Sequence, residues 1–150
     1  MKNHLTSLLL CLVILPAFAQ TNLYENPDFD RIARRHKIIG IIPFNSTVTL
    51  RPKQMKDITP EQLNKMEKSE GESIQSAMYS WFLKREKRGD LTVKVQSPAT
   101  TNAKLLKAGL NPDNFAQHTP EEIAKALEVD AVIMGTFETT KPMSEGASLA

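Results

Sequence analysis

Lys37-Ile38-Ile39-Gly40-Ile41-Ile42-Pro43-Phe44 is the stretch of sequence that decides the fold. Its apolar residues follow one another without alternation, which predicts a strand that is covered on both faces. The proline stands at the end of the run, where a missing N–H does not interrupt a ladder of hydrogen bonds. A strand of this kind is typical of sheets that carry helices on their faces.

A long helix and a second strand follow the first strand. Residues 45–58 are polar and irregular, and we expect them to form a long connection. Thr59-Pro60-Glu61-Gln62 is a capping box with proline in the first turn, so a helix starts there and ends before Gly89. Gly71 weakens the middle of this helix and leaves a break open at that point. The alternating run Leu91–Gln96 predicts a half-buried strand.

The last third of the chain adds two helices and a strand. The first helix is expected over 102–108, and a second capping box at Thr119 starts the other. Residues 131–137 form an apolar strand. The order is strand, helix, strand, helix, helix, strand. It predicts an α/β sandwich of two or three layers around a mixed, partly parallel sheet of at least three strands.

Several large apolar side chains are candidates for the core. Trp81 and Phe82 make a broad apolar face on the long helix, and we expect Trp81 to anchor the core because aromatic side chains bury large areas. Leu105 and Leu106 are expected to point inward, and Phe115 to pack into the core.

The sequence at the start of the chain predicts export, and the sequence at its end predicts that the native chain continues. Residues 1–19 read as a signal peptide, with a positive start, a short apolar run and an A-x-A pattern that places cleavage after Ala19. Cleavage removes Cys11, the only cysteine, and with it thiol chemistry and a lipid anchor. Residues 20–36 form a lead and 37–150 one α/β domain. We expect the native chain to continue past Ala150, although three strands would also suffice.

The charge balance disfavours a nucleic-acid binder. The net charge is +2, and the loss of Lys2 reduces it to +1, whereas nucleic-acid binders carry a concentrated basic footprint. One basic cluster stands out before the first strand. It consists of Arg31, Arg34, Arg35, His36 and Lys37. It is either a solvated segment or a contact for anionic lipid, lipopolysaccharide or another anionic polymer.

Motifs for catalysis, metals and cofactors are absent from the sequence, so we expect no enzyme, no cofactor and no metal site. His36 and His118 lie far apart and neither has a partner at metal-ligand spacing. No nucleophile elbow, phosphate loop or zinc-protease motif occurs. A hydrolase would need carboxylates that the fold brings together, with Asp57, Glu72 and Asp130 as candidates.

Two motifs carry a resemblance to known envelope proteins. The strand Ile38–Phe44, which ends in Pro-Phe, resembles the opening of the TolB amino-terminal-like domains, of the curli-secretion CsgG family and of the outer-membrane activators of penicillin-binding proteins. The segment Ala124–Thr136, a helix, an acidic turn and a strand ending in Gly-Thr, is similar to their later signature. The resemblance covers 37–137. It implies partner binding, assembly or regulation of envelope machinery rather than catalysis.

The leading hypothesis is a non-catalytic exported protein of a Gram-negative envelope, periplasmic or associated with the outer membrane, that binds a protein partner or itself. Its expected contact surfaces are the 45–71 insert and the basic segment, with these residues as candidates: Arg31, Arg34, Arg35, Lys37 and Asn45. After processing we expect no membrane span, and peripheral membrane contact stays open.

Two alternatives remain. The first is a periplasmic small-molecule or glycan-binding protein with a pocket at the carboxyl ends of the strands, lined by Asn45, Ser46, Thr47 and Thr136. The second is an exported hydrolase.

Overall fold

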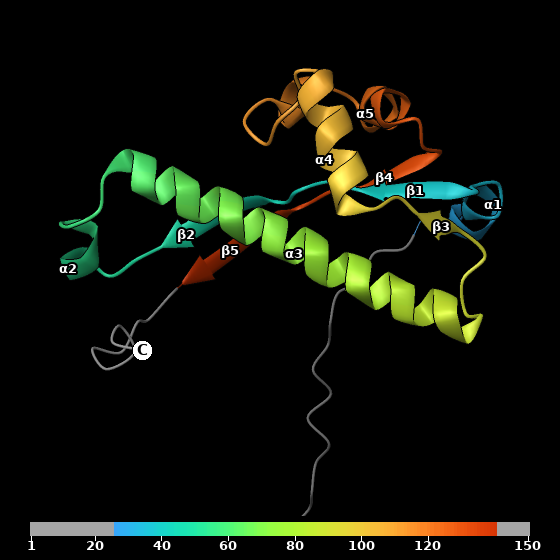
Figure 1. Ribbon diagram of the computed structural model, residues 1–150, viewed down its shortest axis with the longest axis horizontal. Helices are drawn as coiled ribbons and strands as arrows, with labels where there is room; N and C mark the ends of the chain where they lie inside the picture. The colour runs from blue at the N-terminus through green and yellow to red at the C-terminus, as the bar shows by residue number, and fades with distance from the viewer. Residues whose placement is uncertain (1–25, 141–150) are drawn as a thin grey trace, which may run out of the picture.

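Three short parallel strands form the centre of the protein, whose computed structural model describes residues 26–140 (Figure 1). β1 (Ile38–Ile41) lies between β3 (Lys94–Val95) and β4 (Ala131–Ile133). Both pairings are parallel. The predicted α/β class is confirmed, and each of the three segments predicted as strands contributes one strand to this sheet. The expected signal peptide with its cleavage after Ala19, and the end of the chain from 141 to 150, lie outside the described residues.

One face of this sheet is covered by the helices α4 (Pro98–Lys107) and α5 (Pro120–Leu127), which are joined through the 3₁₀ turn η1 (Phe115–Gln117). Burial of apolar side chains between these elements supplies the main stabilisation. The core that they form with the residue that follows β1 consists of Ile42, Leu105, Leu110, Phe115, Ile123 and Leu127. The predicted burial of Phe115 is confirmed.

β1 is buried on both faces from Ile39 to Ile41, as its unbroken apolar run predicts, whereas Ile38 at its start is exposed. A Cβ on Gly40 would lie 3.4 Å from Leu127 Cδ1, so Gly40 faces α5 at close range. Side chains alternate along a strand, and Ile39 and Ile41 therefore point to the other face. Both are buried there as well.

α3 (Pro60–Arg88) is one unbroken helix that runs across both sheets of the protein (Figure 1). Thr59 Oγ1 accepts the Gln62 N–H at 3.2 Å, and the Gln62 side chain accepts the Thr59 N–H at 2.8 Å, which confirms the predicted capping box. Gly89 ends the helix in the left-handed conformation, with φ 78°. The break left open at Gly71 does not occur, because this glycine lets the helix approach the backbone of Phe44.

The buried amide of Gln75 fixes the position of α3. Its Nε2 donates to Ile41 O at 2.7 Å and to Asn102 Oδ1 at 2.9 Å, and Asn102 Nδ2 donates to Gln75 Oε1 at 3.2 Å. These bonds join α3 to β1 and α4. Because an unpaired amide would be costly at this depth, the network favours one placement of the helix.

The structure adds a second parallel sheet, and the prediction of an irregular connection over 45–58 is wrong. That segment contains β2 (Asn45–Thr49) and the short helix α2 (Pro52–Met55). β2 pairs with β5 (Thr136–Thr140). The strand expected over 131–137 is therefore two strands, β4 and β5, that belong to different sheets. The alternation of buried and exposed residues in β2 could not be recognised from the sequence, because most of its side chains are polar.

Three further expectations on the helices are corrected. α4 begins at Pro98 rather than 102, because Ser97 Oγ caps it by accepting the Thr100 N–H at 3.2 Å. Leu106 is 82% exposed, since α4 turns only Leu105 to the core. Trp81 is 49% exposed instead of buried, and its ring packs against the Arg85 guanidinium at 4.1 Å. A short helix, α1 (Phe29–Ala33), precedes β1.

Candidate functional site

The ribbon of β2 and β5 continues from the central strands in parallel register, from Asn45 opposite Thr136 to Thr49 opposite Thr140. The Asn45 N–H donates to Gly135 O at 3.0 Å and sets this register. In a parallel pair the peptide groups of successive residues point to opposite edges of the strand. Each strand of the ribbon therefore has one edge facing its neighbour and one edge facing away.

The outer edge of β2 is closed by α3. The Phe44 N–H, just before the strand, donates to Gly71 O at 3.3 Å. The Val48 N–H donates to Glu67 Oε1 at 3.1 Å, so a helix side chain takes the place of a neighbouring strand. Ser46 and Val48 are buried beneath the helix. No further strand is needed on this side of the ribbon.

The outer edge of β5 is open within residues 26–140, where β2 is its sole strand partner. The register places the peptide groups of Phe137 and Thr139 toward β2. Those of Thr136, Glu138 and Thr140 consequently point away from it. All three residues are exposed. Among residues 26–140, the ribbon thus presents one row of backbone donors and acceptors without a strand partner, and sequence reasoning missed it because 131–137 were taken as one strand.

The four residues proposed for a ligand pocket do not share a cavity. Asn45 and Ser46 line a hollow of about 30 Å³ between β2 and α3, which has room for about one water molecule. The Ser46 hydroxyl is buried there without a hydrogen-bond partner in the described part of the chain. Thr47 and Thr136 lie on the exposed face of the ribbon together with Asn45, whereas Ser46 points to the buried face.

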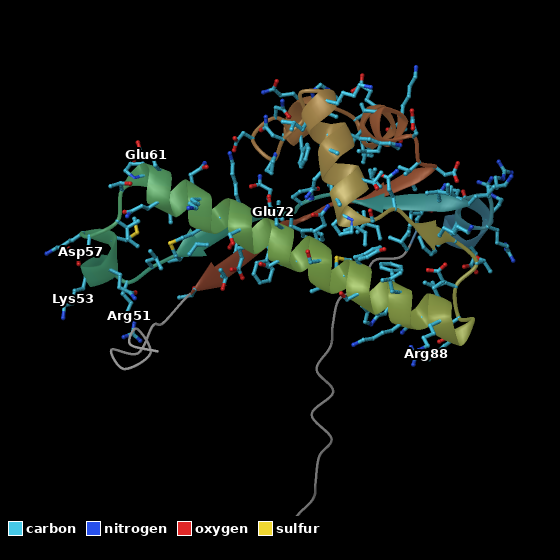
Figure 2. All side chains as sticks on the ribbon, in the orientation of Figure 1. Arg51, Lys53, Asp57, Glu61, Glu72 and Arg88 are labelled. Atoms are coloured by element: carbon cyan, nitrogen blue, oxygen red, sulfur yellow. The ribbon has the colours of Figure 1, made fainter. Side chains whose placement is uncertain are left out.

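The three candidate hydrolase carboxylates lie on different elements. Asp57 follows α2 at one end of the molecule, while Glu72 is near the middle of α3 (Figure 2). Asp130 stands before β4, where Oδ2 accepts the N–H groups of Lys37 at 2.6 Å and Ile38 at 2.9 Å. The structure does not bring these groups together. Asp130 instead fixes the start of β1 against β4.

The two backbone bonds, that of Ile38 first and that of Lys37 second, hold the pKa of Asp130 below the ordinary value of 3.8. The folded protein therefore keeps this carboxylate charged at a pH where the unfolded chain takes up a proton. The stabilisation is complete above the ordinary pKa and is lost as the pH falls through the lowered pKa.

We predict that Asp130→Asn lowers stability at neutral pH and flattens the loss of stability in acid. Asparagine accepts the two N–H groups through a neutral oxygen, so its contribution does not titrate. Urea unfolding from pH 6 down to pH 3 measures the effect. Asp57→Asn, at an exposed residue after α2, serves as the control, and an acid limb of unchanged slope in Asp130→Asn would contradict the assignment.

The predicted basic contact residues gather at one end of the molecule, without Asn45. Arg31 Nε pairs with Asp28 Oδ1 at 3.1 Å, and Arg34 Nε donates to Asp30 O at 3.0 Å. Arg35 and Lys37 are exposed. Asn45 lies in β2, on the ribbon. The cations and Asn45 therefore belong to two separate surfaces.

Comparisons with known proteins add no evidence on function, which is therefore inferred from these surfaces. No protein-family model, curated protein or solved structure matches the chain. The resemblance of 37–137 to the envelope families thus stays a prediction. Across residues 26–140, no cluster of three metal-ligating side chains occurs, and no helix is long and apolar enough to cross a membrane.

Proposed function

We propose that the protein is a non-catalytic interaction module of a bacterial envelope that binds an extended segment of a partner along the outer edge of β5. The open edge of β5 is the observation that carries the proposal. The leader-like sequence of residues 1–19 and the resemblance to envelope proteins support the compartment.

The edge has the features that strand addition requires. An incoming strand can bond to the outward peptide groups of Thr136, Glu138 and Thr140, which supplies affinity without demands on sequence. Natural proteins usually protect such edges with lysine, proline or a bulge. The run Thr136–Thr140 contains no lysine or proline and has high β-propensity. Glu138 is its single charged side chain, and an edge with neither lysine nor proline is suited to pairing.

The chemistry of the edge favours a partner over a second copy. Glu138 is the only charged residue in β5. An antiparallel second copy centred on Glu138 would place two carboxylates opposite each other, which is unfavourable. A partner strand with lysine or arginine opposite Glu138 gains instead from a pair of opposite charges. We therefore propose an extended segment with a basic residue as the occupant.

We predict that Glu138→Pro abolishes partner binding and leaves the fold intact. Proline removes the outward N–H and no bond to β2, and edge strands tolerate it at such positions. A photo-crosslinking residue at position 136 in the native host should give an adduct with a second protein. Glu138→Pro should reduce this adduct at least about tenfold, as expected when main-chain bonds supply the affinity.

Glu138→Gln is the matched control, because it keeps the outward N–H and removes only the charge. It should weaken the adduct by no more than about fivefold, the worth of one cross-strand charge pair. A crosslinker at Thr49, on the inner strand of the ribbon, should react less. An adduct of twice the chain's mass would overturn the choice of partner in favour of a second copy. An adduct that Glu138→Pro leaves unchanged would overturn strand addition.

A further inference from the structure

A second surface, separate from the ribbon, lies at the opposite end of the molecule. α1, β3 and the carboxyl-terminal turns of α3 all reach this end, where Figure 2 labels Arg88. We call it the basic end. It carries nine cations: Arg31, Arg34, Arg35, Lys37, Lys84, Arg85, Lys87, Arg88 and Lys94.

Positive charge is concentrated at this end. The acidic residues at this end are Asp28, Asp30, Glu86 and Asp90, together with Asp130, which accepts the Lys37 N–H. The basic end therefore has a net charge of +4, against +2 for the whole chain. Two of its cations are paired on the surface, Arg31 with Asp28 at 3.1 Å and Arg88 with Asp90 at 3.2 Å. Exposed pairs of this kind bind weakly and leave the local field positive.

Exposed apolar side chains gather at the same end. Nine large hydrophobic residues in the described part of the chain are exposed, and five of them belong to the basic end. These five are Phe29, Ile32, Ile38, Trp81 and Leu83, with exposures of 54%, 41%, 39%, 49% and 39%. Cations mixed with exposed aromatic and aliphatic side chains are the pattern of surfaces that lie on anionic membranes.

Trp81 and Arg85 form a stacked pair of side chains on this surface. The Arg85 guanidinium stacks over the Trp81 ring at 4.1 Å, and Phe82 meets the same ring edge-on at 5.0 Å between centroids. Arg85 Nε is buried without a hydrogen-bond partner among residues 26–140. Arginine binds phosphate through paired N–H groups, and tryptophan prefers the headgroup level of a bilayer. Both preferences fit a phospholipid.

We propose that the basic end docks on bilayers that contain anionic phospholipid, with Trp81 at the headgroup level. The cations provide attraction to the charged surface, and exposed apolar side chains on the Trp81 side of this end enter the boundary between headgroups and acyl chains. The ribbon with the open β5 edge points away from this end along the long axis of the molecule (Figure 1). A docked molecule would keep that edge accessible.

Vesicle binding tests the proposal with the full chain. We expect sedimentation with vesicles of phosphatidylcholine and phosphatidylglycerol, weak binding to phosphatidylcholine alone, and loss of binding at high salt. Trp81 is the only tryptophan, so its fluorescence reports on the proposed contact, and it should shift to the blue on anionic vesicles. Binding without a change in emission would overturn the orientation, and equal binding to both vesicles would overturn the role of charge.

Matched charge reversals test whether vesicle binding depends on the basic end or only on the net charge of the chain. Arg35→Glu combined with Lys84→Glu should weaken binding at least about tenfold, since each basic residue near an anionic surface contributes on the order of fivefold. Lys56→Glu combined with Lys65→Glu changes the net charge equally at the other end, and should have little effect. Residues 1–25 are identical in all variants, so their contribution cancels in the comparison.

Three outcomes complete the test. Equal weakening by both double variants would overturn the basic end as the site. Binding to a short DNA duplex without binding to anionic vesicles would replace the membrane by a soluble polyanion. Glu138→Pro should leave vesicle binding unchanged, so failure of strand addition and failure of membrane docking remain distinguishable.

Discussion

Leu105→Ala is expected to lower the free energy of unfolding by about 2–5 kcal/mol, whereas Leu106→Ala should change it by less than about 0.5 kcal/mol. The two leucines are adjacent on α4, with 3% and 82% of their surfaces exposed. Leu105 contributes to the core cluster with Phe115 and Leu127. Truncation of Leu105 removes buried apolar surface and leaves a cavity, while truncation of Leu106 does neither.

Urea unfolding at neutral pH measures both variants. The substitution is chemically the same and lies on the same helix, so helix propensity cancels between them and burial alone differs. An unchanged m-value would show that the denatured state is not responsible for the difference. Equal losses of stability in the two variants would contradict the orientation of α4.

The same pair of leucines shows what could not be predicted from the sequence. Leu105 and Leu106 are identical in type, and only the position of α4 over β1 decides which of them is buried. The prediction for Trp81 failed for a related reason, because only the placement of α3 against the sheet decides which of its side chains are covered, and Trp81 is 49% exposed. Local signals succeeded where the chemistry is local, as in the capping boxes at Thr59 and Thr119 and in the unbroken apolar run of β1.

The ribbon could not be predicted for a different physical reason. Its strand β2 buries Ser46 and Val48 on alternate positions, but serine and threonine supply little contrast between the two faces. The partner strand β5 lies 91 residues further along the chain, counted between Asn45 and Thr136. A parallel pair with that separation has no turn signal between its strands. The open edge that carries the proposed function was therefore visible only in the fold.

Gly71→Ala should destabilise the protein by about 1–3 kcal/mol, although alanine is the better helix former. A Cβ at this position would overlap the carbonyl oxygen of Phe44, and a backbone atom cannot move aside as a side chain can. α3 would have to lift from the junction of β1 and β2. The free-energy cost of this displacement would exceed the gain of up to about 1 kcal/mol in helix propensity.

Two further variants provide reference values for the loss of stability in Gly71→Ala. A Cβ on Gly135 would lie 2.9 Å from Phe44 Cε1, a ring atom that can shift, so Gly135→Ala should cost less than Gly71→Ala. Ser76→Ala, on the exposed face of α3, should be neutral or slightly stabilising, by up to about 0.5 kcal/mol. Urea unfolding ranks the three. A stabilised Gly71→Ala variant would show that the helix does not approach Phe44 as closely as the fold requires.

Amide exchange connects the Gly71 substitution to the ribbon. The N–H groups of Phe44 and Val48 depend on α3 for their acceptors, Gly71 O and Glu67 Oε1, whereas the Asn45 N–H bonds to Gly135 O. If α3 lifts, exchange at Phe44 and Val48 should accelerate more than exchange at Asn45. The outer edge of β2 would then open as that of β5 already is. Uniform acceleration at all three amides would instead indicate global destabilisation and would contradict the role of α3 as the cover of β2.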